Sequence, residues 1–485
     1  MIRKVFILVY ILCLTWISHA QDFIGMKMSN YSGIYGIGLN PAFQVNGPKQ
    51  IDINFLSLGL SYQSNYVYLE KSNILLAGLK MSKLRPNPAI KMDRSPIENP
   101  LYYNYYNRES EKATYHFYAN AFVNLPSAAI NVRNNSFALS FNDKVLGSIN
   151  DISHDYGYYY YVDSATTEMW LDPMKLGLLH YGEVALTYAT QLPTSGAVDI
   201  NFGVTAKYLL PWDAIYLRNN KRKEAIKIDN GVKIPEGADV DFNWVSSYHY
   251  DYQNDKPVYK LTKNGDGVSV DLGATFVNSF SDENQVHQWK IGIALLDIGK
   301  VFIRNGESNR YITTDTVIYR DEFFSNVKDL DSFRAIANRY AFGGQEKHSV
   351  TGSTFSAWMP LALSIYGDFA IRNNFYLSFQ TLFRAPMKAI GLERSNTIAI
   401  SPRIEKPNFE VAFPIILHEF KYPKAGFYFR KGIFFAGSDN LTAWLIPQKL
   451  NGIDFYLGFR WSGEKSYKST HKRNLRRLTL KCPVF

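Results

Sequence analysis

Eight ionisable side chains that stand in alternating stretches of apolar and polar residues are the groups that could do chemistry in this chain. They are Asp199, Lys207, Asp271, Lys290, Arg403, Glu405, Asp454 and Arg460. Neighbouring side chains of a β-strand point to opposite faces, so we expect these charges on the face opposite the apolar one. Two interpretations stay open: a salt-bridged network filling a closed lumen, or a polar lining along the path of a solute.

The clearest alternation runs from Ala197 to Tyr208, where every second residue from Val198 onward is apolar or aromatic. A soluble sandwich gives this pattern with its polar face in water. A transmembrane barrel gives it with its polar face in a lumen, over about 9–11 residues per crossing. A Lys or Arg on the lipid face costs about 2–4 kcal/mol at mid-membrane, so a barrel would turn these charges inward.

The same alternation recurs along the chain, at 268–276, 289–295, 375–380, 409–415 and 453–461. Asn-rich gaps separate some of these stretches. Arg133-Asn134-Asn135-Ser136 is one such gap, and Arg372-Asn373-Asn374 is another. Short gaps of this composition predict β-hairpins.

The N-terminus indicates export. Arg3 and Lys4 precede an apolar run from Val5 to Ile17, and Ser18-His19-Ala20 supplies small residues for cleavage. We therefore interpret residues 1–20 as a signal peptide. No later stretch approaches 18 uncharged apolar residues, so we expect no transmembrane helix. An exported chain with these strands is typical of an outer-membrane barrel of a Gram-negative bacterium.

Composition agrees with a single barrel domain. Aromatic residues make up 15% of the chain, with 34 Tyr and 32 Phe, which suits aromatic girdles at two membrane interfaces. Of the two cysteines, Cys13 lies in the signal peptide, which leaves Cys482 without an intramolecular partner. Between Asp22 and Trp461 there is no Pro- or Ser-rich linker.

The net charge of +10 belongs mostly to the ends of the chain. Arg3 and Lys4 contribute two, and the stretch after Trp461 contributes a net six. We interpret residues 462–485 as a basic, disordered tail, with an electrostatic contact to lipid phosphates, peptidoglycan or an acidic partner as the alternative. Nucleic acid is not an expected partner of an exported chain.

Four long inserts without clear alternation separate the predicted strands: 70–114, 143–179, 211–266 and 304–355. A helix is possible at 327–340, and Tyr clusters stand at 102–106 and 156–161. Outer-membrane barrels carry long loops on one side and short turns on the other.

Several short motifs together resemble a known family. They are Ser29-Asn30-Tyr31, Leu39-Asn40-Pro41-Ala42, the stretch 265–275, the stretch 291–299, Ser401-Pro402-Arg403 and the stretch 437–441. In this order they resemble an uncharacterised Bacteroidota family of outer-membrane barrels, known as a domain of unknown function. More remotely, the chain is similar to the FadL-like transporters of hydrophobic compounds, a group that includes the PorV barrel of type IX secretion.

The resemblance implies an all-β transmembrane antiparallel barrel of about 14 strands, within 12–16, with an N-terminal plug and long loops. It implies that Asn40, Pro41 and Ala42 shape the plug. Locally, Asn40 suits the cap of a short helix with Pro41 at its first position, which needs no gating role. We expect the plug at 21–50, the barrel at 51–461, and Trp461 as the terminal aromatic residue that the barrel-assembly machinery reads.

A search for catalytic motifs finds little. Gly-x-Ser-x-Gly is absent, and His418-Glu419 lacks the second histidine of a zinc helix. We expect no enzyme, cofactor or metal. The leading hypothesis is passage of a hydrophobic or small ligand through a plugged lumen in the outer-membrane lipid. The alternative is a barrel that does not transport and docks a periplasmic or surface protein of a secretion or motility apparatus. A lipid-acting enzyme is the third hypothesis.

Overall fold

The computed structural model describes residues 23–464 apart from 46, 76–102, 106–114, 154–167, 195, 229–230, 238–239, 248–249, 254–255, 260, 279–285, 314–315, 321–349 and 387–389. The helix expected at 327–340, the Tyr cluster at 156–161, the signal peptide and residues 465–485 of the basic tail lie outside the described residues. Residues 103–105 of the other Tyr cluster, and residues 462–464 of the predicted tail, lie in strands. No described helix is long and apolar enough to cross a membrane.

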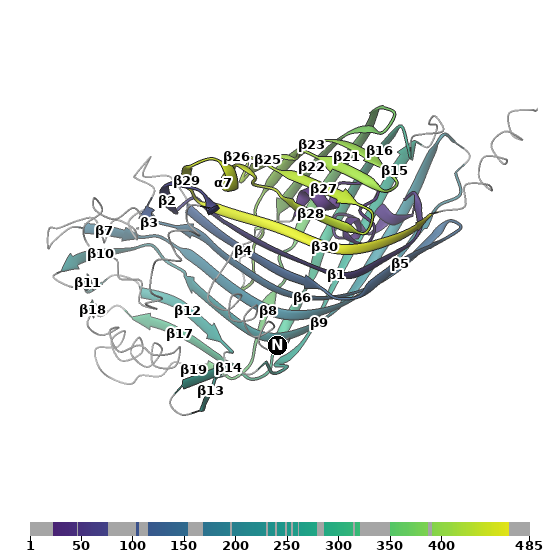
Figure 1. The fold of residues 1–485 in the computed structure, drawn as a ribbon. Coiled ribbons are helices and arrows are strands. Elements are labelled where there is room, and N and C mark those ends of the chain that lie inside the picture. Colours follow the sequence, from purple (N-terminus) through teal and green to yellow (C-terminus); the bar gives the residue numbers. More distant parts are fainter. Residues whose placement is uncertain are drawn as a thin grey trace, which may run out of the picture.

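One antiparallel sheet closes into a barrel, because β1 pairs with β30 (Figure 1). Counting a strand interrupted by a bulge once, the barrel has 14 strands, which confirms the predicted fold. In spatial order they are β1 (Lys49–Ser64), β4 (Tyr115–Asn124) with β5 (Ser127–Val132), β6 (Asn135–Ile152), β8 (Met174–Gln191), β9 (Val198–Asn219), β15 (Gly265–Asn278), β16 (Trp289–Ile303), β20 (Phe355–Trp358) with β21 (Ala362–Arg372), β22 (Phe375–Arg384), β23 (Thr397–Lys406), β24 (Phe409–Ala412) with β25 (Ile415–His418), β26 (Tyr422–Ala425) with β27 (Phe427–Lys431), β28 (Phe434–Ser438) and β30 (Gly452–Glu464).

The two ends of the barrel differ. Short turns at one end join β5 to β6, β21 to β22, β23 to β24 and β27 to β28, and β1 begins and β30 finishes at this same end. We call it the short-turn end. The opposite end, the long-loop end, carries the long connections (Figure 1). The hairpins predicted at 133–136 and 372–374 are confirmed.

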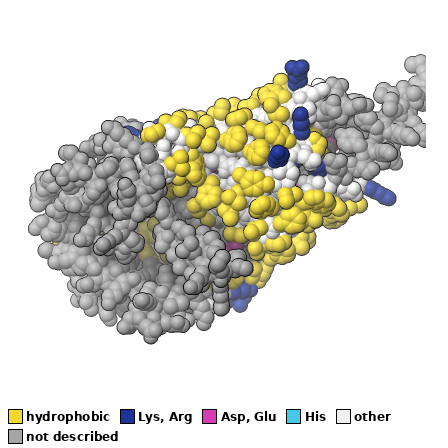
Figure 2. All heavy atoms as spheres, in the orientation of Figure 1, with side chains coloured by type: hydrophobic (Ala, Val, Ile, Leu, Met, Phe, Trp, Pro, Cys, Tyr) yellow, Lys and Arg dark blue, Asp and Glu magenta, His cyan; other side chains and the backbone are white. Residues whose placement is uncertain are grey.

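The outer wall is an apolar band (Figure 2). On β9 Phe202 and Tyr208 are exposed, whereas Asn201 and Thr205 on the opposite face are buried. The same alternation holds along β15, β23 and β30. A band of exposed hydrocarbon around a closed barrel is the arrangement that lipid stabilises.

Further strands lie beyond the band at the long-loop end. β12 (Val240–Ser246) pairs with β9 and with β17 (Glu307–Thr313), which also meets β19 (Val350–Gly352). Connections from three different loops combine into a four-stranded sheet of β7 (Glu168–Leu171), β10 (Lys223–Ile228), β11 (Gly231–Ile234) and β18 (Val317–Arg320). The remaining elements are β13 (Tyr250–Gln253) with β14 (Lys256–Tyr259), β2 (Val67–Ser72) with β3 (Tyr103–Tyr105) and β29 (Gln448–Leu450), and α7 (Thr442–Leu445).

The predicted bounds of two inserts, 143–179 and 211–266, were wrong. β6 continues to Ile152 and β8 begins at Met174, inside the predicted insert 143–179. β9 runs past Pro211 to Asn219, because Pro211 stands at a bulge where the register with β8 shifts, a position that needs no amide hydrogen. Residues 143–152, 174–179 and 211–219 are all buried or half-buried, so these extensions lack the exposed apolar face that produces the alternation within the band.

A plugged lumen as the candidate functional site

The plug is the segment 23–45, which lies inside the barrel as three short helices, α2 (Ile24–Lys27), α3 (Ile34–Ile37) and η1 (Pro41–Gln44) (Figure 1). Its apolar side chains, among them Phe23, Met26 and Phe43, are buried against inward-facing tyrosines of the wall. Helices this short have little stability of their own. Their conformation therefore depends on contacts with the barrel.

Asn40 shapes the end of the plug and also ties it to the wall. Its Oδ1 accepts a hydrogen bond from the Ala42 amide at 2.9 Å, which caps η1 ahead of Pro41. Its Nδ2 donates to the carbonyl oxygens of Ala274 on β15, at 2.9 Å, and Ile293 on β16, at 3.0 Å. The local cap and a contact with the barrel are thus served by one side chain.

Three glycines on neighbouring strands make room for this contact. A Cβ on Gly203 would lie 2.8 Å from the Pro41 carbonyl oxygen, and one on Gly273 would lie 2.8 Å from Cγ of Asn40. A Cβ on Gly292 would lie 3.0 Å from Nδ2 of Asn40. Glycine within a strand marks the close approach of another backbone. We call Gly203, Gly273 and Gly292 the glycine seat.

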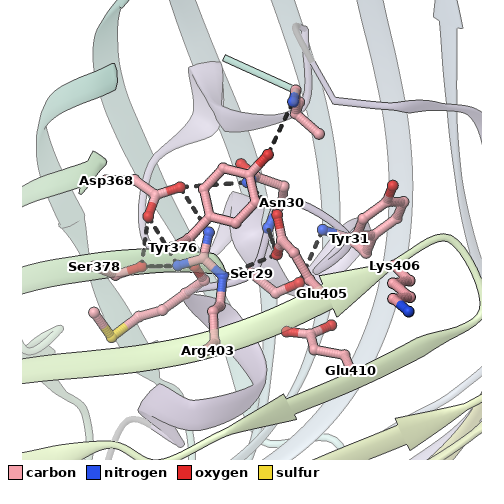
Figure 3. Close-up of polar contacts among 12 residues, drawn as sticks. Ser29, Asn30, Tyr31, Asp368, Tyr376, Ser378, Arg403, Glu405, Lys406 and Glu410 are labelled. Carbon is pink, nitrogen blue, oxygen red and sulfur yellow. Dashed lines mark hydrogen bonds and ion pairs between the residues drawn. The ribbon is translucent and has the colours of Figure 1, made fainter. Parts of the chain in front are cut away.

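A buried ionic cluster holds the middle of the plug (Figure 3). Arg403 donates from Nη1 and Nη2 to the two carboxylate oxygens of Asp368, at 2.8 and 2.6 Å, and from Nε to Glu405 at 2.8 Å. Asn30 of the plug donates its side-chain amide to Glu405 and Asp368, at 2.5 and 3.3 Å. The plug thereby supplies hydrogen-bond donors to carboxylates that are fully buried.

His287, Asp368 and Ser378 form a buried Ser–Asp–His group within this cluster. Nε2 of His287 lies 2.9 Å from one oxygen of Asp368, and the Ser378 hydroxyl donates to the other at 2.8 Å. A nucleophilic serine needs the histidine as its base, with the acid behind the histidine. Here the carboxylate lies between the two, so the geometry does not suit nucleophilic catalysis.

The start of the plug is held by Asp439, directly after β28. The carboxylate of Asp439 accepts hydrogen bonds from the amides of Ile24 and Gly25, at 2.6 and 3.0 Å, and from the Tyr456 hydroxyl at 3.1 Å. Asp454 on β30 accepts from the Asp439 amide at 2.6 Å and so positions it. Together with Asn40 and the Arg403 cluster, Asp439 gives the plug three separate polar attachments.

Arg460 and Lys290 add contacts from opposite sides of the lumen. Arg460 lies 3.6 Å from Asp52 and donates to the Tyr31 carbonyl, and Asp52 accepts from the Ile34 amide at 3.1 Å. Lys290 donates to the Phe43 carbonyl at 2.9 Å, with its Nζ 3.6 Å from the centre of the Phe43 ring. Both cations are buried.

A cavity of about 160 Å³ lies beside the plug. Phe23, Met26, Ile34 and Ile37 line it from the plug, and Leu392 lines it from the β22–β23 connection, which folds inward from the long-loop end. Its charged lining consists of four acids and four bases: Glu183, Asp271, Asp297, Glu393, Lys27, Lys144, Lys207 and Arg394. The cavity is therefore apolar on its plug side apart from Lys27, and its charged lining as a whole is balanced.

The charges of this wall pair with one another at a bulge. Lys207 lies 2.7 Å from Asp271 and 2.6 Å from Asp297, which also pairs with Arg394. Asp297 has a φ of 58°, a left-handed conformation unusual for a residue with a side chain, and it sits where the β15–β16 register shifts. The Asp271 carboxylate accepts from the Asp297 amide at 2.7 Å and so supports the bulge.

The eight ionisable residues singled out from the sequence fall into separate groups. Arg403 and Glu405 meet in one cluster, and Lys207 and Asp271 line the cavity. Lys290 and Arg460 contact the plug, and Asp454 positions Asp439, which holds the start of the plug. Asp199 is half-buried at the short-turn end of β9. Trp461 is exposed on the outer wall, three residues before the end of β30 at Glu464. The barrel begins at Lys49, slightly before the expected 51.

Sequence reasoning missed Asp368, Asp439, Asp297 and the glycine seat. The glycines carried a signal, because each occupies an inward position of an alternating stretch, where a polar residue otherwise stands. The three aspartates carried none. Their contacts with Asn30, Gly25 and Lys207 span 338, 414 and 90 residues of sequence. Among the described residues no group of three or more His, Cys, Asp or Glu side chains could hold a metal ion.

Comparison with solved structures gives distant likenesses. A TodX deltaS2S3 mutant monoaromatic hydrocarbon channel has a TM-score of 0.36 and 7% identity, covering 89% of this chain and 94% of its own. A FadL homologue of Pseudomonas aeruginosa has a TM-score of 0.35 and 9% identity, covering 87% and 92%. The CymD monoaromatic hydrocarbon channel has a TM-score of 0.25 and 10% identity, covering 93% and 99%.

No curated protein matches this sequence. A family model does match, over residues 41–439, from the Asn40-capped helix of the plug to the aspartate that anchors its start. This match spans most of the chain. The chain therefore belongs to the family described as "Family of unknown function (DUF5723)".

Proposed function

We propose that this chain is an outer-membrane barrel that passes a small, uncharged ligand with an apolar face through its plugged lumen. The observation that carries the proposal is the cavity of about 160 Å³ between the plug, the charged wall and the inward-folded β22–β23 connection. The plug is the barrier that the ligand must displace on its way from the cavity to the short-turn end.

The shape of the barrel supports a place in an outer membrane. Barrels of this membrane carry short turns on the periplasmic side and longer loops outside. The short-turn end of this chain would therefore face the periplasm, where both the plug and the end of β30 are attached. The ligand would enter from the long-loop end.

The lining of the cavity supports an uncharged ligand. Lys207 and Arg394 are paired with aspartates, and Lys144 is paired with Glu183 at 2.7 Å. A charged ligand would have to break one of these buried pairs, which costs several kcal/mol. A cavity of about 150 Å³ holds a molecule the size of benzene, so the space suits an aromatic alcohol.

The test uses two matched alanines. Ala185 faces the cavity, and Ala206 on the neighbouring strand faces outward. In vesicles with lipopolysaccharide in the bilayer, the wild type should take up radiolabelled benzyl alcohol faster than protein-free vesicles. Ala185→Phe, which fills the cavity, should reduce uptake to the protein-free rate, and Ala206→Phe should not. Equal uptake by wild-type and protein-free vesicles, or full uptake by Ala185→Phe, contradicts the proposal.

The alternative function, a docking or assembly subunit, is favoured by a different observation. Three loops contribute strands to the sheet of β7, β10, β11 and β18, which has its own small core around Met169 and Ala225. Trp170 on this sheet is exposed, and the Arg222 guanidinium lies 4.5 Å from its ring centre. Two results together would favour docking. The folded wild type would show no uptake, and a partner that co-purifies with the wild type would be lost in Trp170→Ala.

A further inference from the structure

Four exposed cations stand at the short-turn end, and we call them the basic rim: Arg133, Arg372, Lys406 and Lys431. Each lies in a hairpin or immediately before its turn. Among the residues described at this end they are the exposed charged side chains, and no exposed carboxylate accompanies them.

Three of these cations repeat one arrangement on consecutive short hairpins. Arg372 pairs across the hairpin with Phe375, Lys406 with Phe409, and Lys431 with Phe434. Phe409 and Phe434 are 39% and 38% exposed on the outer wall. A cation next to an exposed aromatic ring marks the depth at which a membrane passes from acyl chains to head groups.

Exposed apolar residues next to the rim cations also place these cations at the edge of the apolar band. Ile371 precedes Arg372 and is 58% exposed, and Val132 precedes Arg133 and is 46% exposed. Figure 2 shows Lys and Arg side chains projecting beyond the apolar band toward this end. The basic rim therefore begins where the lipid-facing hydrocarbon stops.

Charge pairing distinguishes this rim from the long-loop end. There Lys263 lies 2.5 Å from Asp266, Arg310 lies 3.0 Å from Asp241, and Arg222 lies 3.2 Å from Asp172. No ion pair is recorded for the four rim cations among the described residues. Among the described residues, the rim cations are therefore exposed charges without an ion-pair partner, whereas the cited cations of the long-loop end are paired.

We propose that the basic rim binds the head groups of anionic phospholipids in the leaflet at the short-turn end. The depth of the cations suits a lipid phosphate better than a soluble partner, because their aliphatic stems can lie along acyl chains while their charges meet the head groups. Each cation near such a surface favours the anionic lipid by about fivefold. This inference does not depend on passage of a ligand.

The test measures lipid selectivity with the full chain. Purified protein is placed in bilayers of zwitterionic lipid with about 10 mol% of phosphatidylglycerol, and native mass spectrometry records which lipid stays bound. The wild type should retain phosphatidylglycerol over the zwitterionic lipid. The variant Arg372→Gln/Lys406→Gln/Lys431→Gln should lose at least tenfold of this preference, since it lacks three cations.

The matched control is Lys221→Gln/Arg304→Gln/Lys449→Gln, which removes the same number of exposed cations from the long-loop end. Both variants keep the tail after residue 464, so a contribution of that tail cancels. The control should retain the wild-type preference, and heat-modifiable migration confirms folding of both variants. An unchanged preference in the rim variant, an equal loss in the control, or displacement of the bound lipid by millimolar inorganic phosphate would overturn the proposal.

Discussion

A single methyl group at position 273 should loosen the plug. In Gly273→Ala the new Cβ would lie 2.8 Å from both Cγ of Asn40 and Cδ of Pro41, so the Asn40 side chain has to move. Its three hydrogen bonds, to Ala42, Ala274 and Ile293, are then lost or weakened. At about 1 kcal/mol for each neutral hydrogen bond, the closed plug loses about 3 kcal/mol.

This loss corresponds to a roughly 100-fold larger population of the open plug. Hydrogen exchange of the peptide 39–45, followed by mass spectrometry, reports that population directly. We expect exchange in this peptide to accelerate by up to that factor, with the barrel strands unchanged. The control Gly367→Ala adds a methyl near the flexible ring of Phe369 and leaves the glycine seat untouched. Unchanged exchange in folded Gly273→Ala would refute the account of the seat.

Three further changes test other parts of the structure. Arg403→Met removes the guanidinium from the buried carboxylates of Asp368 and Glu405 and should cost about 3–5 kcal/mol, measured by urea unfolding in detergent. A loss below about 1 kcal/mol would contradict the role of the cluster. Burial lowers the pKa of Lys223, the first residue of β10, to about 8. Loss of its proton therefore stabilises the folded sheet of β7, β10, β11 and β18. Resistance of the loops to protease should therefore increase as the pH rises through 8 toward 10 in wild type but not in Lys223→Gln. An equal increase in both proteins would contradict this role of Lys223. Truncation after Glu464 should leave heat-modifiable migration intact, because β30 is complete at that residue, and its loss would show that the tail is needed for folding.

The barrel could be predicted because its signal is local. Alternation with a period of two assigns each strand residue to a face without knowledge of its neighbours, as along Ala197 to Tyr208. The strand number, about 14, and the closed barrel came from the resemblance to a known family. Extensions beyond the apolar band escaped prediction, because strands such as the last part of β9 carry no alternation there.

The plug could be placed from the sequence only in outline. The Asn40-Pro41 cap is local, but the donors and acceptors that hold the plug come from distant strands. Asn30 meets Asp368 across 338 residues of sequence, and Ile24 meets Asp439 across 415. For such pairs a single sequence shows only the position of each residue in the strand alternation. That position predicts that a charged side chain points inward, but not which residue it contacts.

The most direct test of a ligand site in the lumen is calorimetric titration of the folded barrel in detergent. The account predicts that wild type binds benzyl alcohol in preference to benzoate and benzylammonium, that Ala185→Phe binds none of them, and that Ala206→Phe binds like wild type. Binding of the alcohol that persists in Ala185→Phe, or a preference for either charged analogue, would contradict a charge-balanced cavity beside the plug as the ligand site.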